Sequence, residues 1–344
     1  MRPMLKTLAP AWHLVLAVAV VVLAWSLAAR SAADGGQPEE PAASPSGAGG
    51  RAPVRELGDG VASPAGGVRL PAGLLQLPPS VDAALVVDLS RNRMYVYKNH
   101  RPIPRLAADL YVSIGKNGSH KEREGDEKTP VGVYFVTDFI PGSRLPELYG
   151  AGAFPVDYPN LWDRRLGRTG SGIWIHGMPE SMITRPPRSS RGCLTLANDD
   201  FRAIARSVEP GRTPVVISDR IEWLSPEAIA VQRNGVLRAQ EAWRQAWESL
   251  DTERYLSFYA TDFRSGNMDI IAWIRHKRRV NAAKSYIRVE VSDLGLYRYP
   301  GEDDLVLLDF LQTYRSSNYD TTSRKRQLWR LRQGRWRIVQ EGRG

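Results

Sequence analysis

The chain has 344 residues, of which 42% are hydrophobic and 24% charged, with a formal net charge of +10 and a pI near 9.8. This length argues against a single hydrophobic core and predicts two folded units of about 100 to 150 residues each. The charge favours anionic surroundings, namely nucleic acid, anionic lipid or an acidic cell-wall polymer, although an arginine-rich solvated surface would have the same balance.

The first 33 residues predict export from the cytoplasm. Arg2 and Lys6 precede an uncharged apolar stretch at 7–29, and about twenty apolar residues suffice to cross a bilayer. We expect 1–33 to be an uncleaved membrane anchor, and a signal peptide cleaved after Ala33 is the alternative. The predicted location is therefore the periplasmic or extracytoplasmic cell envelope, anchored to the cytoplasmic membrane, which argues against nucleic acid as a partner.

The next segments predict a tether followed by a mostly β domain. Residues 34–79 are rich in Gly, Ala, Pro and Ser and predict a disordered tether. In the domain at 80–220, one helix begins near Asn198 and stops near Pro210. Alternating apolar residues predict strands at 84–89, 94–97, 107–113, 132–137, 173–176 and 213–218.

After a connector at 221–235, residues 236–344 predict an α+β domain in which helices precede an antiparallel sheet. The expected helices are 235–250, 252–259 and 270–281, and the expected strands are 286–296, 304–314, 324–332 and 335–340. A two-residue turn at Gln333 and Gly334 would place Arg332 opposite Arg335 and Arg330 opposite Arg337. Such facing cations require anions, either carboxylates of the same domain or an anionic cell wall.

Cys193 is the only cysteine of the chain, so it cannot form an internal disulfide, and in an exported protein it invites a chemical role. The alternative is a small buried apolar side chain. A thiol needs a base to act as a nucleophile at neutral pH, and His176, at the end of a predicted strand, is the candidate. Gly192 has no side chain to block a substrate carbonyl, so the amides of Gly192 and Cys193 are candidates for an oxyanion hole.

Other chemistries lack support in the sequence. His100, His120 and His276 have no metal-ligand spacing to another His, Cys or carboxylate, so we predict neither a metal nor a cofactor. Several serines lie near the candidate site, but none has the nucleophile-elbow pattern of a serine hydrolase. They are Ser113, Ser189 and Ser190.

The segment 190–193, Ser-Arg-Gly-Cys, resembles the L,D-transpeptidase catalytic domain family, in which a His-Gly strand end is followed by Ser-x-Gly-Cys. Three further elements are similar to that family: Ser-Ile-Gly at 113–115, Lys-Thr-Pro-Val-Gly-Val-Tyr at 128–134 and Pro-Gly-Arg-Thr-Pro-Val at 210–215. The likeness covers 80–220. Residues 236–344 resemble the nuclear-transport-factor-like or SnoaL-like α+β cone, a fold that hosts enzymes and binding modules alike.

The first resemblance implies a β-sandwich-like fold that acts on peptidoglycan stem peptides. The Cys193 thiolate would attack the carbonyl of the third, diaminopimelate-type residue of a tetrapeptide, and the terminal D-Ala would leave. The thioester would then pass to an amine of a stem or protein, or to water. In this scheme His176 takes the thiol proton and the carbonyl of Gly177 orients its ring.

One departure concerns the substrate. Many family members have Arg two positions after the cysteine, where this chain has Thr195. If that Arg holds a substrate carboxylate, Arg188 or Arg191 must replace it, with Ser190 as a further substrate-binding candidate. Three functions therefore stay open: an L,D-transpeptidase, an amidase or hydrolase with the same Cys-His chemistry, and a non-catalytic cell-wall-binding protein. We interpret the C-terminal domain as a binding or positioning module.

Overall fold

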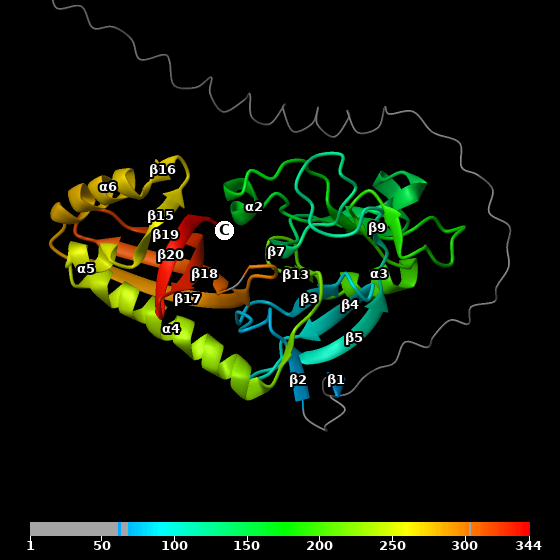
Figure 1. The fold of residues 1–344 in the computed structure, drawn as a ribbon, viewed down its shortest axis with the longest axis horizontal. Helices are drawn as coiled ribbons and strands as arrows, with labels where there is room; N and C mark the ends of the chain where they lie inside the picture. Colours follow the sequence, from blue (N-terminus) through cyan, green and yellow to red (C-terminus); the bar gives the residue numbers. More distant parts are fainter. Residues whose placement is uncertain (1–60, 63–67, 303) are drawn as a thin grey trace, which may run out of the picture. The chain divides into compact units, whose positions relative to one another are not determined.

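The computed structural model describes residues 61–62, 68–302 and 304–344, which belong to one compact unit. A mixed five-stranded sheet forms the centre of the first domain, in the order β5-β4-β3-β13-β7 (Figure 1). β13 runs parallel to β3 and antiparallel to β7. These strands confirm five of the predicted ones within two residues at most ends. Their bounds are Ala83–Asp88 for β3, Arg93–Lys98 for β4, Arg105–Tyr111 for β5, Gly132–Phe135 for β7 and Pro214–Ser218 for β13.

Both faces of this central sheet are buried. Along β3, Ala84 and Val86 belong to one hydrophobic cluster while Leu85 and Val87 belong to another. Successive side chains of a strand point to opposite faces, so a run that is apolar at every position needs cover on both sides. One cluster joins the sheet to the second sheet of the same domain, and the other joins it to the C-terminal domain.

The second sheet consists of short strands in the order β12-β10-β9-β8, and a parallel pair, β11-β6, lies apart from it. Only β10 was predicted, because two- to four-residue strands leave little periodicity to detect. The mainly β class is confirmed. The bounds are Ile114–Gly115 for β6, Ile140–Pro141 for β8, Gly152–Pro155 for β9, Trp174–His176 for β10, Arg188–Ser190 for β11 and Leu194–Thr195 for β12, with helices η1 (Gly142–Arg144), η2 (Glu147–Tyr149), α2 (Leu161–Arg165) and α3 (Asn198–Ala205).

The C-terminal domain combines three helices with a six-stranded sheet in the order β16-β15-β20-β19-β18-β17, and α4 runs along β17 (Figure 1). The predicted α+β layout is confirmed. The bounds are Pro226–Glu248 for α4, Thr252–Leu256 for α5, Ile270–Ala282 for α6, Tyr259–Ser265 for β15, Met268–Asp269 for β16, Ile287–Arg298 for β17, Leu305–Ser316 for β18, Thr321–Arg332 for β19 and Arg335–Arg343 for β20.

Two details of this domain differ from the prediction. Helix α4 begins at Pro226, well before 235, because the Ser225 side chain accepts a hydrogen bond from the Ala228 amide and Pro226 suits the first helical position. The helix predicted at 252–259 ends at Leu256, and Tyr259 begins β15, which pairs in parallel with β20. The register of the last hairpin is the predicted one, with Arg330 opposite Arg337 and Arg332 opposite Arg335.

The predicted tether is wrong at its C-terminal end. Val68–Pro71 forms β2, which pairs with β1 (Val61–Ala62) and β14 (Trp223–Leu224). Leu70, Leu74 and Leu75 are buried in the cluster shared with the C-terminal domain. A leucine-rich segment buries enough apolar surface to offset the conformational entropy that it loses on becoming ordered. The average composition of 34–79 is dominated by Gly, Ala, Pro and Ser and did not reveal this segment. Residues 34–60 and 63–67 of the predicted tether lie outside the described residues.

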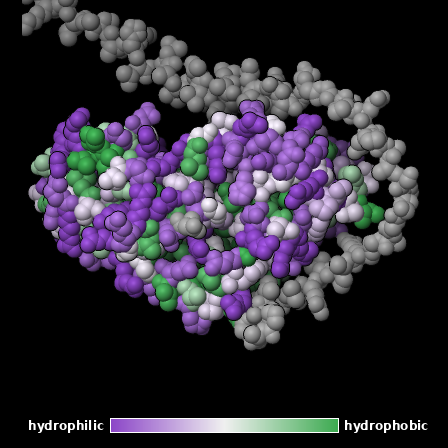
Figure 2. Space-filling view, viewed as in Figure 1, coloured by the Kyte–Doolittle hydropathy of each residue, from purple (hydrophilic) through white to green (hydrophobic). Residues whose placement is uncertain are grey.

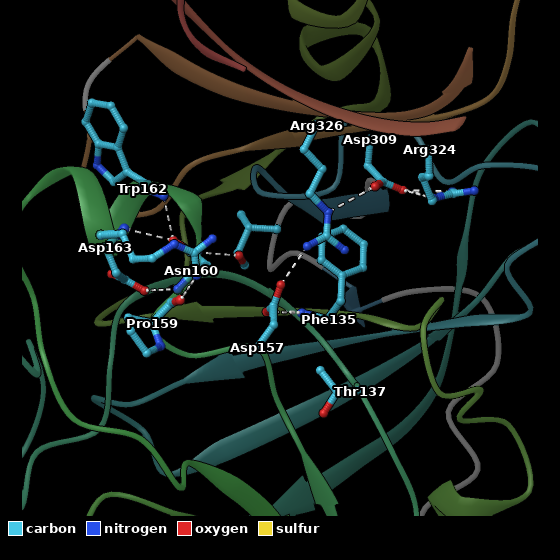
Figure 3. Close-up of polar contacts among 12 residues, drawn as sticks. Phe135, Thr137, Asp157, Pro159, Asn160, Trp162, Asp163, Asp309, Arg324 and Arg326 are labelled. Carbon is cyan, nitrogen blue, oxygen red and sulfur yellow. Dashed lines mark hydrogen bonds and ion pairs between the residues drawn. The ribbon is translucent and has the colours of Figure 1, made fainter. Parts of the chain in front are cut away.

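An ionic network joins the two domains (Figure 3). Arg326 on β19 donates to Asp157 at 2.6 Å and to Asp309 at 3.1 Å, and its guanidinium lies 3.7 Å from the centre of the Phe135 ring. Asp157 also accepts from the Phe135 amide at 2.8 Å, and Arg324 donates to the other oxygen of Asp309 at 2.9 Å. The network therefore ties β19 to the segment directly after β9.

A view of one face shows apolar side chains as small, separate patches on a mostly hydrophilic surface (Figure 2). No helix within the described part of the chain has both the length and the apolar character needed to cross a bilayer. The predicted anchor, 1–33, lies outside the described residues.

Candidate active site

Neighbouring strands bring the predicted nucleophile and base together. His176 is the last residue of β10, and Cys193 directly precedes β12, which runs parallel to β10 with Thr195 opposite His176. The Leu196 amide donates to the His176 carbonyl at 2.9 Å. The long loop between 176 and 193 thus returns the chain to the adjacent strand.

Hydrogen bonds define the tautomer of His176. Its Nδ1 lies 2.6 Å from the Gly177 carbonyl oxygen. A carbonyl can only accept, so Nδ1 carries the proton and Nε2 is the basic nitrogen. The Thr195 hydroxyl lies 3.3 Å from Nε2, and the Tyr149 ring meets the imidazole edge-on at 5.0 Å between centroids. The ring is buried, which holds Nε2 in one direction.

Side-chain hydrogen bonds shape the loop that carries Cys193. The Ser190 hydroxyl donates to the Cys193 carbonyl at 2.6 Å and accepts from the Gly192 amide at 3.1 Å. Thr129 donates to the Gly192 carbonyl at 3.1 Å. Gly192 has φ near +119°, and a Cβ there would lie 2.7 Å from the Lys128 carbonyl oxygen. The segments 113–115, 128–134 and 190–193 therefore converge on one turn that requires glycine.

Burial favours the neutral forms of both the Cys193 thiol and the His176 imidazole. Burial lowers the pKa of His176 to about 4, although its bond to Gly177 opposes this and the positive charge of Arg185 adds to it. Burial also raises the pKa of the Cys193 thiol, opposed by the Trp174 amide and by the charges of Arg185 and Lys121. Cys193 is half-buried, and its Sγ lies 3.4 Å from the Gly172 carbonyl oxygen. At neutral pH the imidazole is thus free to take the thiol proton.

The remaining predicted site residues differ in their exposure and in their hydrogen-bond partners. Arg191 is exposed, with Nε 3.9 Å from Glu127, and Arg188 is exposed above Gly118. Ser190 is buried and engaged within its own loop. The Gly192 amide already donates to Ser190, which leaves the Cys193 amide as the oxyanion donor without a partner among the described residues. The oxyanion hole of two amides stays a prediction, and in this arrangement the Gly192 amide is engaged by Ser190.

Asn198 and Tyr149 also shape the site, and neither was predicted as a site residue from the sequence. The Asn198 side chain accepts from the Ala151 amide at 2.8 Å and donates to the Met178 carbonyl at 2.8 Å, so it clamps the segments on either side of His176. A Cβ on Gly177 would lie 2.3 Å from the Asn198 Oδ1, which explains the glycine after the histidine. Tyr149 packs on Trp174 as well as on the imidazole. Neither residue belongs to a short motif, so no local signal pointed to them.

The C-terminal domain has a cavity of about 580 Å³ with cationic and aromatic walls. Lys277 lies over the rings of Trp247 and Trp273, 4.5 Å from each centroid, and Lys284 and Lys325 also line the cavity. On the outer hairpin, Arg330 pairs with Glu302 and Arg332 with Asp262, so carboxylates of the same domain offset two of the facing arginines. Within the described residues no cluster of His, Cys, Asp and Glu could hold a metal ion.

Comparison with known families agrees with this geometry. Residues 82–217 match the family described as the L,D-transpeptidase catalytic domain, and residues 235–342 match the Cds6 C-terminal NTF2-like domain. Together with a solved structure that is 32% identical over 79% of this chain, these matches show that the chain belongs to the L,D-transpeptidase family, with a C-terminal NTF2-like domain.

The solved structure of Bd1075 from Bdellovibrio bacteriovorus is 32% identical to this chain, covers 79% of this chain and 97% of its own, and has a TM-score of 0.69. Pgp2 from Campylobacter jejuni, described as a helical cell shape determining protein, is 26% identical, covers 78% of this chain and 94% of its own, and has a TM-score of 0.66. No curated protein matches the chain in sequence. The similarity to both structures spans the two domains together.

Proposed function

We propose that this chain is a cysteine acyltransferase that acts on peptidoglycan stem peptides. The observation that supports it is the parallel pairing of β10, which ends at His176, with β12, which begins directly after Cys193, together with the bond that Gly177 accepts from the Nδ1 proton of the imidazole. The similarity to a helical cell shape determining protein supports a substrate in the cell wall.

The chemistry follows from this arrangement. His176 Nε2 takes the thiol proton as Sγ bonds to the carbonyl carbon of the third stem residue, and the Cys193 amide donates to the oxyanion. The C–N bond to the terminal D-Ala then breaks, and the imidazolium returns the proton to the leaving amine. The product is a thioester on Cys193, which the acceptor resolves by attack at the same carbon.

Transfer to an amine, giving a cross-link or an attached protein, is the first proposed outcome. Hydrolysis is the second, and a specific observation favours it. Arg185 and Lys121 both act on the thiol with positive charge, and of the two only Arg185 has no carboxylate partner among the described residues, since Lys121 is paired with Asp126 at 2.7 Å. An amine acceptor arrives mostly as an ammonium ion, which this field repels, whereas water carries no charge.

We further propose an envelope location in which the segment 1–33 anchors the chain in the cytoplasmic membrane. Arg2, Lys6 and the apolar stretch at 7–29 support this proposal. The anionic cell wall would then be the surface that the basic chain meets. The non-catalytic alternative, a wall-binding protein with an inert Cys193, differs from the enzyme in one measurable property, the acylation of the thiol.

Mass spectrometry of the purified chain with a tetrapeptide stem tests the proposal. We expect a covalent adduct on Cys193 equal to the stem minus alanine, and release of D-alanine. With an amine-bearing stem present, a cross-linked product indicates transfer, and a free tripeptide alone indicates hydrolysis. Cys193→Ala should form no adduct and no product. A wild-type chain that binds the stem without any adduct or D-alanine release would identify the non-catalytic alternative.

A further inference from the structure

Arg185 lies in the loop between His176 and Cys193 and is held in one conformation. Its Nε donates to the Ser189 hydroxyl at 3.1 Å and its Nη2 to the Ser189 carbonyl at 3.3 Å. Tyr111 donates to the Arg185 carbonyl at 2.8 Å, which ties the backbone to β5. The side chain is half-buried, whereas Thr184 and Pro186 on either side are exposed.

The loop around Arg185 is also connected to the catalytic strands. Ser189 shares a 2.9 Å hydrogen bond with Ser113, whose backbone exchanges two 2.9 Å hydrogen bonds with Thr195. Thr195 lies opposite His176 in the parallel strand pair. A continuous series of contacts therefore fixes the guanidinium relative to the thiol and the imidazole, and its positive charge lowers the pKa of both.

The guanidinium retains unused donors. Within the described residues, no carboxylate pairs with Arg185, and its Nη1 has no hydrogen-bond partner. Arg191, by contrast, has Glu127 nearby and is 78% exposed at its side chain, and Arg188 lies in the exposed part of the loop. A half-buried, preorganised arginine with free N–H groups is suited to bind a carboxylate that arrives from outside.

We propose that Arg185 binds the terminal carboxylate of the donor peptide and so determines that cleavage occurs one residue from a free C-terminus. In a tetrapeptide this carboxylate is separated from the attacked carbonyl carbon only by the amide nitrogen and one Cα. A cation held within the loop that joins His176 to Cys193 is in a position to meet it. Arg185 is then a specificity-determining residue, in place of the Arg188 or Arg191 that the sequence suggested. The inference rests on the proposed function.

The first test compares two substrates, a tetrapeptide with a free C-terminal carboxylate and the same peptide with a C-terminal amide. The wild-type chain should prefer the free acid in kcat/KM by about tenfold or more, as expected for a charge-assisted contact. Arg185→Ala should reduce this preference towards one, and Arg185→Lys should retain part of it. Arg212→Ala, which removes an exposed arginine bonded to the Ser80 carbonyl, is the control for net charge and should keep the preference.

A second test does not depend on peptide turnover. Cys193 is the only cysteine, so alkylation reports this site alone. In the wild type, the ratio of the alkylation rate with anionic iodoacetate to that with neutral iodoacetamide should be raised by the positive charge of Arg185. This ratio should fall in Arg185→Ala and stay unchanged in Arg212→Ala. A missing turnover with the alkylation contrast intact would refute the proposed reaction and keep the anion site. The inference would be overturned if Arg185→Ala kept the preference for the free C-terminal acid or the difference between the two alkylating reagents. It would also be overturned if Arg188→Ala, and not Arg185→Ala, removed them.

Discussion

The active site and the contact between the two domains hold buried polar groups in opposite ways. Around His176 the partners are a backbone carbonyl and a hydroxyl, and burial keeps the imidazole neutral. At the domain contact, Arg326 is paired with both Asp157 and Asp309. Burial raises the pKa of Asp157 while the charge of Arg326 opposes the change.

Under the proposed function, only the candidate active site changes its charge. A neutral imidazole can accept a proton without first breaking an ion pair, so the site is prepared for proton transfer. A half-buried carboxylate between two domains is stabilised by its cation, so the ionic network acts as a fixed connection. Substitutions at His176 should therefore affect mainly activity, and substitutions at Arg326 should affect mainly stability.

The largest expected effect is on the chemistry. His176→Gln removes the base while leaving a side chain of similar size, so acylation of Cys193 by the stem should fall by about 10²- to 10⁴-fold. Thr195→Val removes only the hydroxyl beside Nε2 and should cost less than about tenfold. Stopped-flow mass spectrometry of the thioester measures both rates. Equal losses in the two variants would mean that His176 is not the base.

The next effect is on stability. Arg326→Ala leaves the half-buried Asp157 without its cation, whereas Asp309 keeps Arg324, so the loss should lie at or below the lower end of the about 3 to 5 kcal/mol that is typical when one partner of a buried ion pair is removed. Arg332→Ala breaks a more exposed pair with Asp262 and should cost about 1 kcal/mol at most. Urea denaturation measures both. A loss for Arg326→Ala no larger than that for Arg332→Ala would show that the network contributes little.

The smallest expected effect is a pH dependence that belongs to His176. The unfolded imidazole binds a proton near pH 6.5, whereas the folded one does so only near pH 4. The unfolded state therefore binds more protons between these values, so stability is complete above pH 6.5 and is lost as the pH falls towards 4. Relative to His176→Gln, the wild type should lose at most about 3 kcal/mol over this range. Urea denaturation at a series of pH values measures this loss. If the free energy of unfolding fell equally with pH in the wild type and in His176→Gln, the low pKa of His176 would be contradicted.

Local patterns explain which features could be predicted. Cys193 and His176 stand beside glycines whose need is visible in the structure: a Cβ at 177 or 192 would lie under 3 Å from neighbouring atoms. The hairpin register at β19 and β20 follows from a two-residue turn at 333–334, which needs no distant contact. By contrast, 68–79 was assigned to a tether because its neighbours are polar, although its leucines pack between domains.

Sequence alone determined the fold classes of the two domains and pointed to Cys193 and His176 as candidates, because periodicity and the spacing of a few residues encode both. Tertiary structure decided how the arginines of the loop between His176 and Cys193 are held. Arg185 is held by Ser189 and Tyr111, residues on different segments, and its neighbour Arg188 has the same charge but projects elsewhere. A long loop between two adjacent strands has no period of its own, so the direction of its side chains depends on hydrogen bonds to residues distant in the chain.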